Sequence, residues 1–284
     1  DRIFYKPSSY LSASLITTNN DFYEITNTNL LWKVDIKDNL KFDNLHSFLW
    51  LARLDRKNSK TITKNIIESW INFFFNYHPD TWSMQIMARR IIAWTSNTDI
   101  TLENANNEYK RKFFVSLIKQ SNFLSRNLNS LVYQPDKIIC CAAIILSGMI
   151  FENNSSNYKI GIKELEKIIR ICFDELGFPK SRNPEEVFIY LKYLILIREW
   201  LKEGQKPIPD FLNDIIRKCG SCYVAFSCSN KQFPLFNGAT EINFKDYDLF
   251  LKTLKYKFVS KNYKIADFII VKKKKFDFFI DCGN

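Results

Sequence analysis

Glycine and proline are scarce in this sequence, which has 7 Gly and 8 Pro among 284 residues. A fold made of many short strands needs these residues repeatedly, because tight turns require positive φ angles or a fixed φ. The scarcity excludes such a fold as the main architecture and favours helices. With 46% hydrophobic and 25% charged residues, the chain can bury a large core in one domain, or in one domain and part of another.

Long hydrophobic runs are also missing. The most apolar stretch, residues 138–150, is shorter than the ~20 residues that span a bilayer, so we expect no membrane span. The seven Cys are scattered and odd in number, unlike the dense, even set of a secreted disulfide framework. Cys219 and Cys222 have the spacing of a metal or redox motif, but no second pair or His cluster completes a zinc site. The sequence therefore predicts no metal and no cofactor.

Negative charge is in deficit, because 41 Lys and Arg stand against 30 Asp and Glu, giving a net charge of +11. An excess of this size favours an acidic polysaccharide, a nucleic acid or an anionic membrane surface as partner. The joint richness in Lys, Asn, Ile and Phe leaves a second explanation open, a compositional bias without selection for charge. No nucleic-acid-binding motif occurs, so we predict no nucleic acid partner.

Apolar residues at three- and four-residue spacing run through residues 44–226, with short polar breaks between the periodic segments. Pro184 and Pro207 stand at such breaks, where a helix can begin without the missing N–H. Long helices with short links must be antiparallel neighbours, and this many in succession predict stacked or circularly arranged hairpins. The predicted helices are residues 44–56, 59–77, 82–97, 104–128, 136–152, 160–176, 184–203 and 208–226.

The pattern changes after Phe226, where β-type residues become frequent. We predict an antiparallel hairpin over residues 266–281, with Lys272 to Lys275 in its turn. An isolated hairpin is marginal in water, so we expect an apolar face that is exposed or lightly covered, and further strands beyond a truncated end. The predicted domains are residues 1–254, which are helical, and residues 255–284, which begin a β domain.

Several segments resemble the helical domain of the heparinase II/III family of polysaccharide lyases. Residues 44–51, Asn-Leu-His-Ser-Phe-Leu-Trp-Leu, are similar to the family's Asn-Leu-His-Tyr-Phe-Asp-Tyr-Leu segment. Residues 82–94 resemble its Trp…Arg-Ile-Ile-Asn-Trp helix, and residues 233–238 resemble the Leu-Ala-Leu-Phe-Asn-Gly of one bacterial subgroup. Residues 177–184 fall where relatives carry a Gly-rich turn that enters a helix. Residues 269–283 resemble the first strands of the family's β-sandwich.

The resemblance implies a mainly α fold, an (α/α) toroid of antiparallel helical hairpins followed by the first strands of a β-sandwich. It also implies β-elimination beside a uronic acid in an acidic polysaccharide. In that reaction a base takes the proton alpha to the sugar carboxylate, an acid protonates the leaving oxygen, and donors neutralise the carboxylate. The implied location is the cell envelope or periplasm, with the cytoplasm as the alternative.

Arg182 and Asn183 are the candidate catalytic residues. Arg182 offers a bidentate fork for a carboxylate, Asn183 offers neutral donors, and both precede a helix whose free N–H groups favour an anion. Asn183 could equally cap the helix that begins at Pro184. The candidate substrate-binding residues, which offer stacking faces, donors or positive charge in the matched segments, are His46, Trp50, Trp82, Arg89 and Trp94.

The helix after Trp82 carries an apolar stripe that should face the core. Trp82 and Arg89, seven residues apart, are predicted to lie on the opposite side, where together they suit sugar stacking and anion pairing. We expect both to line one concave surface with Arg182 and with His46 or Trp50. The predicted core stripe consists of Met84, Met87, Ala88 and Ile91.

The sequence departs from the family at its catalytic positions. Glu186 holds the place of the family's Tyr, and Pro135 and Asp136 roughly match its Asn-His pair. Tyr190 or Tyr193 could replace that Tyr, although core packing is the more frequent role. The predicted function is a lyase-like protein that acts on a uronic-acid polysaccharide. The alternative is a non-catalytic module that binds an acidic glycan in the same cleft, and the oligomeric state stays unassigned.

Overall fold

The computed structural model describes residues 3–15, 27–28, 30–33, 36–151, 155–228, 230, 232–242, 244–260, 264–273 and 276–283. About 62% of the described residues are helical. The chain forms two compact units, Asp1–Ile162 and Lys163–Asn284, and the boundary falls inside α8 (Ser155–Cys172). The domain boundary predicted after residue 254 stays a prediction. In the described part of the chain, no helix is long and apolar enough to cross a membrane.

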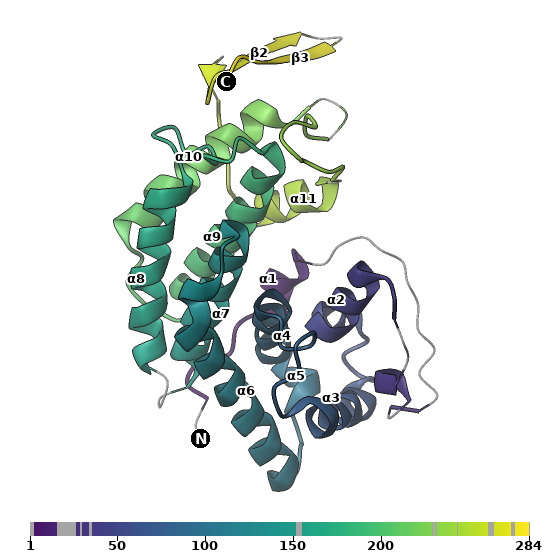
Figure 1. The fold of residues 1–284 in the computed structure, drawn as a ribbon. Coiled ribbons are helices and arrows are strands. Elements are labelled where there is room, and N and C mark those ends of the chain that lie inside the picture. Colours follow the sequence, from purple (N-terminus) through teal and green to yellow (C-terminus); the bar gives the residue numbers. More distant parts are fainter. Residues whose placement is uncertain are drawn as a thin grey trace. The chain divides into compact units, whose positions relative to one another are not determined.

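The first unit is built around α4 (Met84–Ser96), which contacts α2, α6 and α7 (Figure 1). Almost every residue of α4 is buried, because the helix carries apolar side chains on most of its sides. The predicted core stripe, which includes Met87 and Ile91, lies in the core. The elements before α8 are α1 (Ser9–Ala13), η1 (Leu31–Lys33), α2 (Asn39–Ser47), η2 (Leu49–Arg53), α3 (Lys60–Phe74), α4, α5 (Thr98–Thr101), α6 (Asn107–Asn127), η3 (Leu128–Ser130) and α7 (Gln134–Ile150).

Capping residues determine where α2 begins and ends. The Asp38 side chain accepts a hydrogen bond from the Lys41 backbone N–H at 3.1 Å, which satisfies one of the free donors of the first turn. At the other end, Phe48 has a φ of 59°, and this left-handed conformation stops the helical hydrogen bonding. The single helix predicted over residues 44–56 is therefore wrong, because Phe48 separates α2 from the 3₁₀ helix η2.

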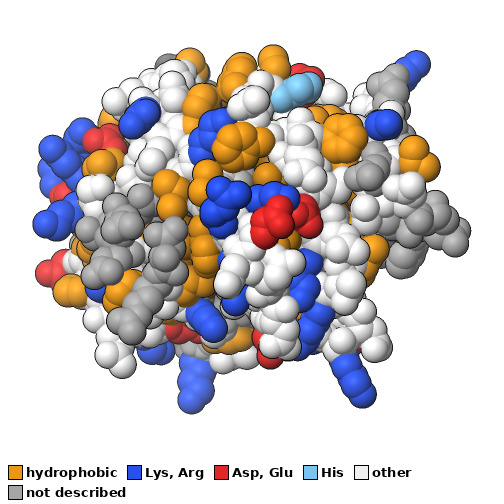
Figure 2. Space-filling model, turned by 90° about the horizontal axis from the view of Figure 1, so that it is seen from below, with side chains coloured by type: hydrophobic (Ala, Val, Ile, Leu, Met, Phe, Trp, Pro, Cys, Tyr) orange, Lys and Arg blue, Asp and Glu red, His pale blue; other side chains and the backbone are white. Residues whose placement is uncertain are grey.

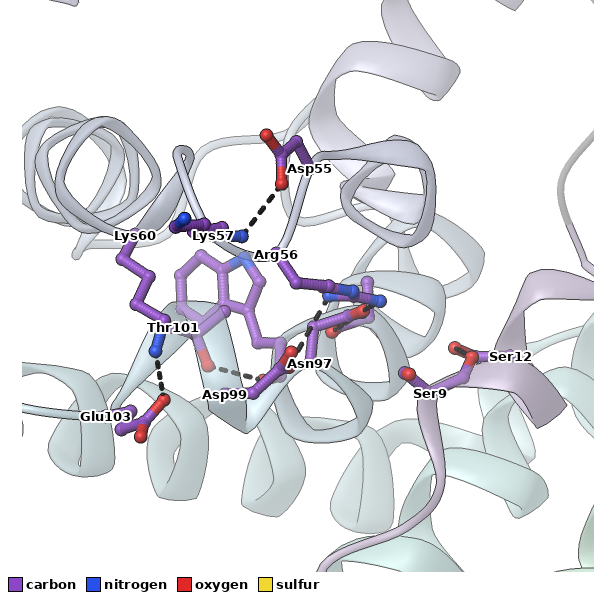
Figure 3. Close-up of polar contacts among 12 residues, drawn as sticks. Ser9, Ser12, Asp55, Arg56, Lys57, Lys60, Asn97, Asp99, Thr101 and Glu103 are labelled. Atoms are coloured by element: carbon purple, nitrogen blue, oxygen red, sulfur yellow. Dashed lines mark hydrogen bonds and ion pairs between the residues drawn. The ribbon is translucent and has the colours of Figure 1, made fainter.

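Polar contacts tie the loop before α3 to the segment around α5 (Figure 3). Arg56 Nη2 donates to Asn97 Oδ1 at 2.7 Å, and its Nη1 pairs with Asp99 at 3.4 Å. Lys60 pairs with Glu103 on the same side. These ion pairs are partly exposed, and such pairs contribute about 0–1 kcal/mol each. They position the loop more than they stabilise the unit.

The second unit contains α9 (Pro184–Glu203), α10 (Asp210–Phe226) and α11 (Lys245–Thr253). The short link between α9 and α10 makes them adjacent, and α9 is buried on most of its surface. Gly177 lies in the turn before α9 with a φ of +83°. A Cβ at this position would come within 2.5 Å of Lys218 Cβ and 2.9 Å of Cys219 N. The turn therefore requires glycine for both its backbone angle and its approach to α10.

Three antiparallel strands end the second unit, β1 (Lys264–Ile265), β2 (Phe268–Lys273) and β3 (Phe276–Asp281), in the order β1-β2-β3. One face of the sheet packs on α10, where Phe268 is buried and the Phe279 ring stacks on Phe226 with centroids 5.8 Å apart. The opposite face exposes Phe278 by 50% and Ile280 by 39%. The predicted antiparallel hairpin is confirmed (Figure 1), and these exposed side chains form its apolar outer face.

The predicted turn of the hairpin is wrong in part. Lys272 and Lys273 belong to β2 and pair with Asp277 and Phe276, whereas residues 274–275 lie outside the described residues. Lys272 Nζ donates to the carbonyl oxygens of Val224 at 2.9 Å and Ser227 at 2.6 Å. These carbonyls belong to the end of α10, so Lys272 caps that helix, where positive charge is also favoured by the helix dipole.

Replacing Lys272 by Met should lower the free energy of unfolding by about 1 kcal/mol, because two helix-end carbonyls lose a charged donor. Urea denaturation followed by circular dichroism measures the change. Lys273→Met is the matched control, because Lys273 is an exposed neighbour in the same strand. Equal stability of the two variants would contradict the capping role.

Candidate functional site

Four polar side chains from three helices form a half-buried group in the first unit, namely Asp43 of α2, Gln85 and Arg89 of α4, and Asp136 of α7. Gln85 and Arg89 share one face of α4 because they are four residues apart. With its amide nitrogen facing the carboxylate, Gln85 donates to both oxygens of Asp136 at 2.9 Å. Arg89 lies close enough to Asp43 and Asp136 for its positive charge to lower the pKa of both carboxyl groups.

The two carboxyl groups respond to opposing influences. Burial raises the pKa of Asp43, and the positive charge of Arg89 partly offsets the rise. Burial also raises the pKa of Asp136, with Arg89 opposing and the negative charge of Asp43 adding to the rise. The hydrogen bonds from Gln85 favour the ionised form of Asp136. The group therefore combines the acceptors of two carboxyl groups with the donors of Gln85 and Arg89.

A buried arginine follows Arg89 on α4. Arg90 is 0% exposed, and burial lowers its pKa. Its Nε donates to Gln120 Oε1 at 2.8 Å, its Nη1 donates to the His46 carbonyl oxygen at 3.0 Å, and both Nη atoms donate to the Thr81 carbonyl oxygen at 3.1 Å. The guanidinium also lies 3.9 Å from the centroid of the Trp70 ring. Arg90 thus joins α2, α3, α4, α6 and the loop before α4.

The predicted aromatic residues occupy different environments. Trp94 is fully buried, with its ring edge-on to Trp70 at 5.5 Å, so it offers no face to a ligand. Trp82 is only 4% exposed, and its Nε1 donates to the Phe74 carbonyl oxygen at 2.9 Å. The expected outward orientation of Trp82 is wrong, because α4 begins at Met84 and helical spacing does not apply to Trp82. Trp50 is half-buried and keeps part of its surface accessible.

His46 ends α2 and is 4% exposed. Its Nδ1 accepts a hydrogen bond from Trp70 Nε1 at 3.1 Å. Burial lowers the pKa of His46 to about 3, and the positive charges of Arg90 and His78 add to this effect. The ring is therefore neutral at ordinary pH and is a poor carrier of protons.

The turn before α9 holds the two predicted catalytic residues, both in the second unit. Asn183 is the N-cap of α9, and its Oδ1 accepts a hydrogen bond from the Glu185 backbone N–H at 2.8 Å. Arg182 has a φ of 61°, pairs through Nη2 with Asp281 of β3, and lies 5.2 Å from the Phe268 ring. These contacts give both residues structural roles. Their catalytic role, and a surface shared with Arg89, stay predictions.

Glu186 occupies the first turn of α9 and is 5% exposed. Ser181 Oγ donates to its Oε2 at 2.7 Å. Burial raises the pKa of Glu186, while the hydrogen bonds from Ser181 and Tyr190 oppose the rise. Tyr190 is 1% exposed and Tyr193 is 4% exposed. Both tyrosines therefore pack in the core.

Replacing Arg182 or Asp281 by Ala should lower the free energy of unfolding, because the ion pair between them connects β3 to the turn before α9. The side chains are 22% and 23% exposed, so we expect a coupling energy of about 1 kcal/mol in a double-mutant cycle. Urea unfolding of the two single variants and the double variant measures it. Strictly additive effects would show that the ion pair contributes nothing.

Sequence reasoning missed Asp43 and Gln85 as members of the site, and it missed the buried Arg90 beside Arg89. The four-residue spacing of Gln85 and Arg89 was a usable signal, because it places both on one helix face. Nothing in the sequence indicates that Asp43 and Asp136, which are far apart in the chain, meet beside Arg89. Among the described residues, no group of three or more His, Cys, Asp or Glu side chains is placed to hold a metal ion.

Comparison with solved structures identifies proteins of similar fold. A heparan sulfate lyase mutant from Pedobacter heparinus matches 92% of this chain with a TM-score of 0.64 and 11% identity. A heparinase III gene product matches 92% with a TM-score of 0.63 and 15% identity. The crystal structure of a heparinase III matches 78% with a TM-score of 0.60 and 18% identity. No protein family and no curated protein matches the sequence.

The chain spans about half the length or less of these solved chains, namely 48%, 49% and 39%. At such low identity the likeness shows the fold alone. The chain therefore has the helical toroid fold of the heparinase III structures, followed by a small three-stranded antiparallel sheet.

Proposed function

We propose that the chain binds an acidic polysaccharide through the half-buried group of Asp43, Gln85, Arg89 and Asp136. The observation that carries the proposal is the likeness in fold to heparinase III over 92% of the chain. The net charge of +11 supports an anionic partner. On the face drawn in Figure 2, Lys and Arg side chains lie among hydrophobic ones, which suits a polymer that has both charge and apolar ring faces.

Binding without cleavage is the function that the local chemistry favours. β-Elimination requires a group that gives up and takes up a proton near the operating pH. The pKa of His46 is lowered to about 3, and Tyr190 and Tyr193 are buried. Glu186 is buried as well, at the position that resembles the family's catalytic Tyr. The second candidate is a lyase acting by β-elimination on a uronic-acid polymer, which the fold favours.

The experiment is titration of the protein with a uronic-acid polymer, with affinity followed by calorimetry and cleavage by the ultraviolet absorbance of the unsaturated product. Binding without product supports the binding module. Binding with product accumulating at an enzymatic rate supports the lyase. Absence of binding to any uronic-acid polymer contradicts both.

Replacing Arg89 by Ala should weaken binding about tenfold or more, because a charged hydrogen bond contributes about 1.5–3 kcal/mol. Affinity of the unchanged protein should also fall as salt is added, since charges are screened over ~8 Å at physiological ionic strength. Arg111→Ala is the control, because it removes the same charge from an exposed position on α6. Equal affinity of the two variants would exclude Arg89 from the binding surface.

A further inference from the structure

The imidazole of His46 is enclosed by aromatic rings. The centroid of Phe42, one turn earlier on α2, lies 4.3 Å from it, and the centroids of Trp32 and Phe74 lie at 5.4 Å. The residue is 4% exposed. A polar ring in such surroundings is stable only if its nitrogens find partners.

The hydrogen bond from Trp70 determines which nitrogen of His46 carries the proton. An indole Nε1 is a donor only, so His46 Nδ1, 3.1 Å away, must be the unprotonated acceptor. A neutral imidazole then has its hydrogen on Nε2. The low pKa of His46, which follows from burial and from the charges of Arg90 and His78, keeps the ring neutral. The hydrogen bond from Trp70 therefore determines the tautomer of His46, instead of the equilibrium between the two tautomers of a free imidazole in water.

Arg90 holds both members of this pair in place. Its Nη1 donates to the carbonyl oxygen of His46 at 3.0 Å, and its guanidinium lies 3.9 Å from the Trp70 ring centroid. The imidazole cannot turn without breaking the hydrogen bond from Trp70. Trp70 therefore positions the imidazole directly, and Arg90 acts through the Trp70 ring and the His46 backbone.

The Nε2–H of His46 has no acceptor among the residues that the structure describes. The Nε2 atom is not among the side-chain atoms that are both completely enclosed and unpaired in the described part of the chain, so an incoming oxygen atom can reach it and accept its hydrogen bond. We propose that His46 is a ligand-binding residue that donates its Nε2–H to a carboxylate or hydroxyl oxygen of the bound sugar. The inference rests on the proposed polysaccharide-binding function and adds to it the donor that recognises the sugar.

Nuclear magnetic resonance of protein labelled with ¹⁵N-histidine tests the tautomer directly. The chain has only two His, so a His78→Gln variant assigns the remaining signals to His46. We expect Nε2 to be protonated and Nδ1 to be unprotonated, without change from about pH 8 to about pH 5, the range in which an ordinary His titrates. A hydrogen on Nδ1, or a second proton taken up in this range, would overturn the inference.

Addition of an oligogalacturonate to the labelled protein tests the ligand contact. We expect the Nε2 and Hε2 signals of His46 to shift, and His46→Gln to bind within a few-fold of the unchanged protein, since its amide N–H replaces Nε2–H. His46→Asn should bind about tenfold more weakly, as expected for the loss of a hydrogen bond to a charged group. Melting temperatures of both variants separate unfolding from lost contact.

The outcomes distinguish this inference from the function on which it rests. Calorimetric binding of the oligogalacturonate with unmoved His46 signals would overturn the His46 contact and leave the proposed function intact. Equal affinity of a folded His46→Asn variant and a folded His46→Gln variant would do the same. Absence of binding by the unchanged protein would overturn the proposed function and the inference together.

Discussion

Replacement of Arg90 by Ala is expected to lower the free energy of unfolding by about 4 kcal/mol or more, enough to unfold many domains. Arg90 is fully buried and donates to Gln120, to the Thr81 carbonyl and to the His46 carbonyl. Without it, each of these buried acceptors loses its donor, at a cost of about 1–3 kcal/mol apiece. The cavity left under the Trp70 ring adds to the loss.

The adjacent arginine provides the control for this prediction. Arg89→Ala changes the same residue type at the next position of α4, where the side chain is half-buried, and should cost far less stability. Arg90→Lys should recover little, because one ammonium group cannot reach acceptors on three separate segments. Thermal and urea unfolding measure all three variants. An Arg90→Ala protein as stable as Arg89→Ala would show that the buried network is not a stabilising feature.

Acidification is expected to destabilise the protein through His46. The pKa of His46 is about 3 in the folded protein, against an ordinary value of 6.5. Below about pH 6.5 His46 binds a proton in the unfolded chain but not in the folded protein, so the free energy of unfolding falls as the pH falls. Between about pH 7 and about pH 5 this single group should cost about 2 kcal/mol.

Other groups contribute to the same pH range with the opposite sign. Burial raises the pKa of Asp43, Asp136 and Glu186 in the folded protein, and such groups stabilise it as the pH falls. The contribution of His46 is therefore the difference between the unchanged protein and His46→Gln, in which the titration is removed. Urea unfolding at a series of pH values measures this difference, with His78→Gln as control. If the stability of the unchanged protein and that of His46→Gln changed equally with pH, His46 would not be the group that destabilises the protein in acid.

Local sequence patterns determined the helical architecture. The apolar spacing of α3 to α10 and the breaks at Pro184 and Pro207 required only neighbouring residues, so most helices were predicted close to their observed bounds. The hairpin of β2 and β3 followed in the same way from its β-type residues. The predicted bounds were wrong where the backbone conformation of one residue ends a helix. Phe48 is such a residue, because its left-handed φ divides one predicted helix into two elements.

Only the tertiary structure decided what the predicted site residues do. Arg89 and Arg90 are adjacent and identical in the sequence, yet one reaches a half-buried polar group and the other is fully enclosed. Arg182 could serve a uronate by its chemistry, but in the fold its guanidinium is paired with Asp281, far away in the chain. A side chain's partners depend on which distant segments pack against it, and spacing along the chain carries no information about them. The sequence by itself determined the helices and the candidate chemistry, whereas packing determined which groups are buried, paired or left able to bind.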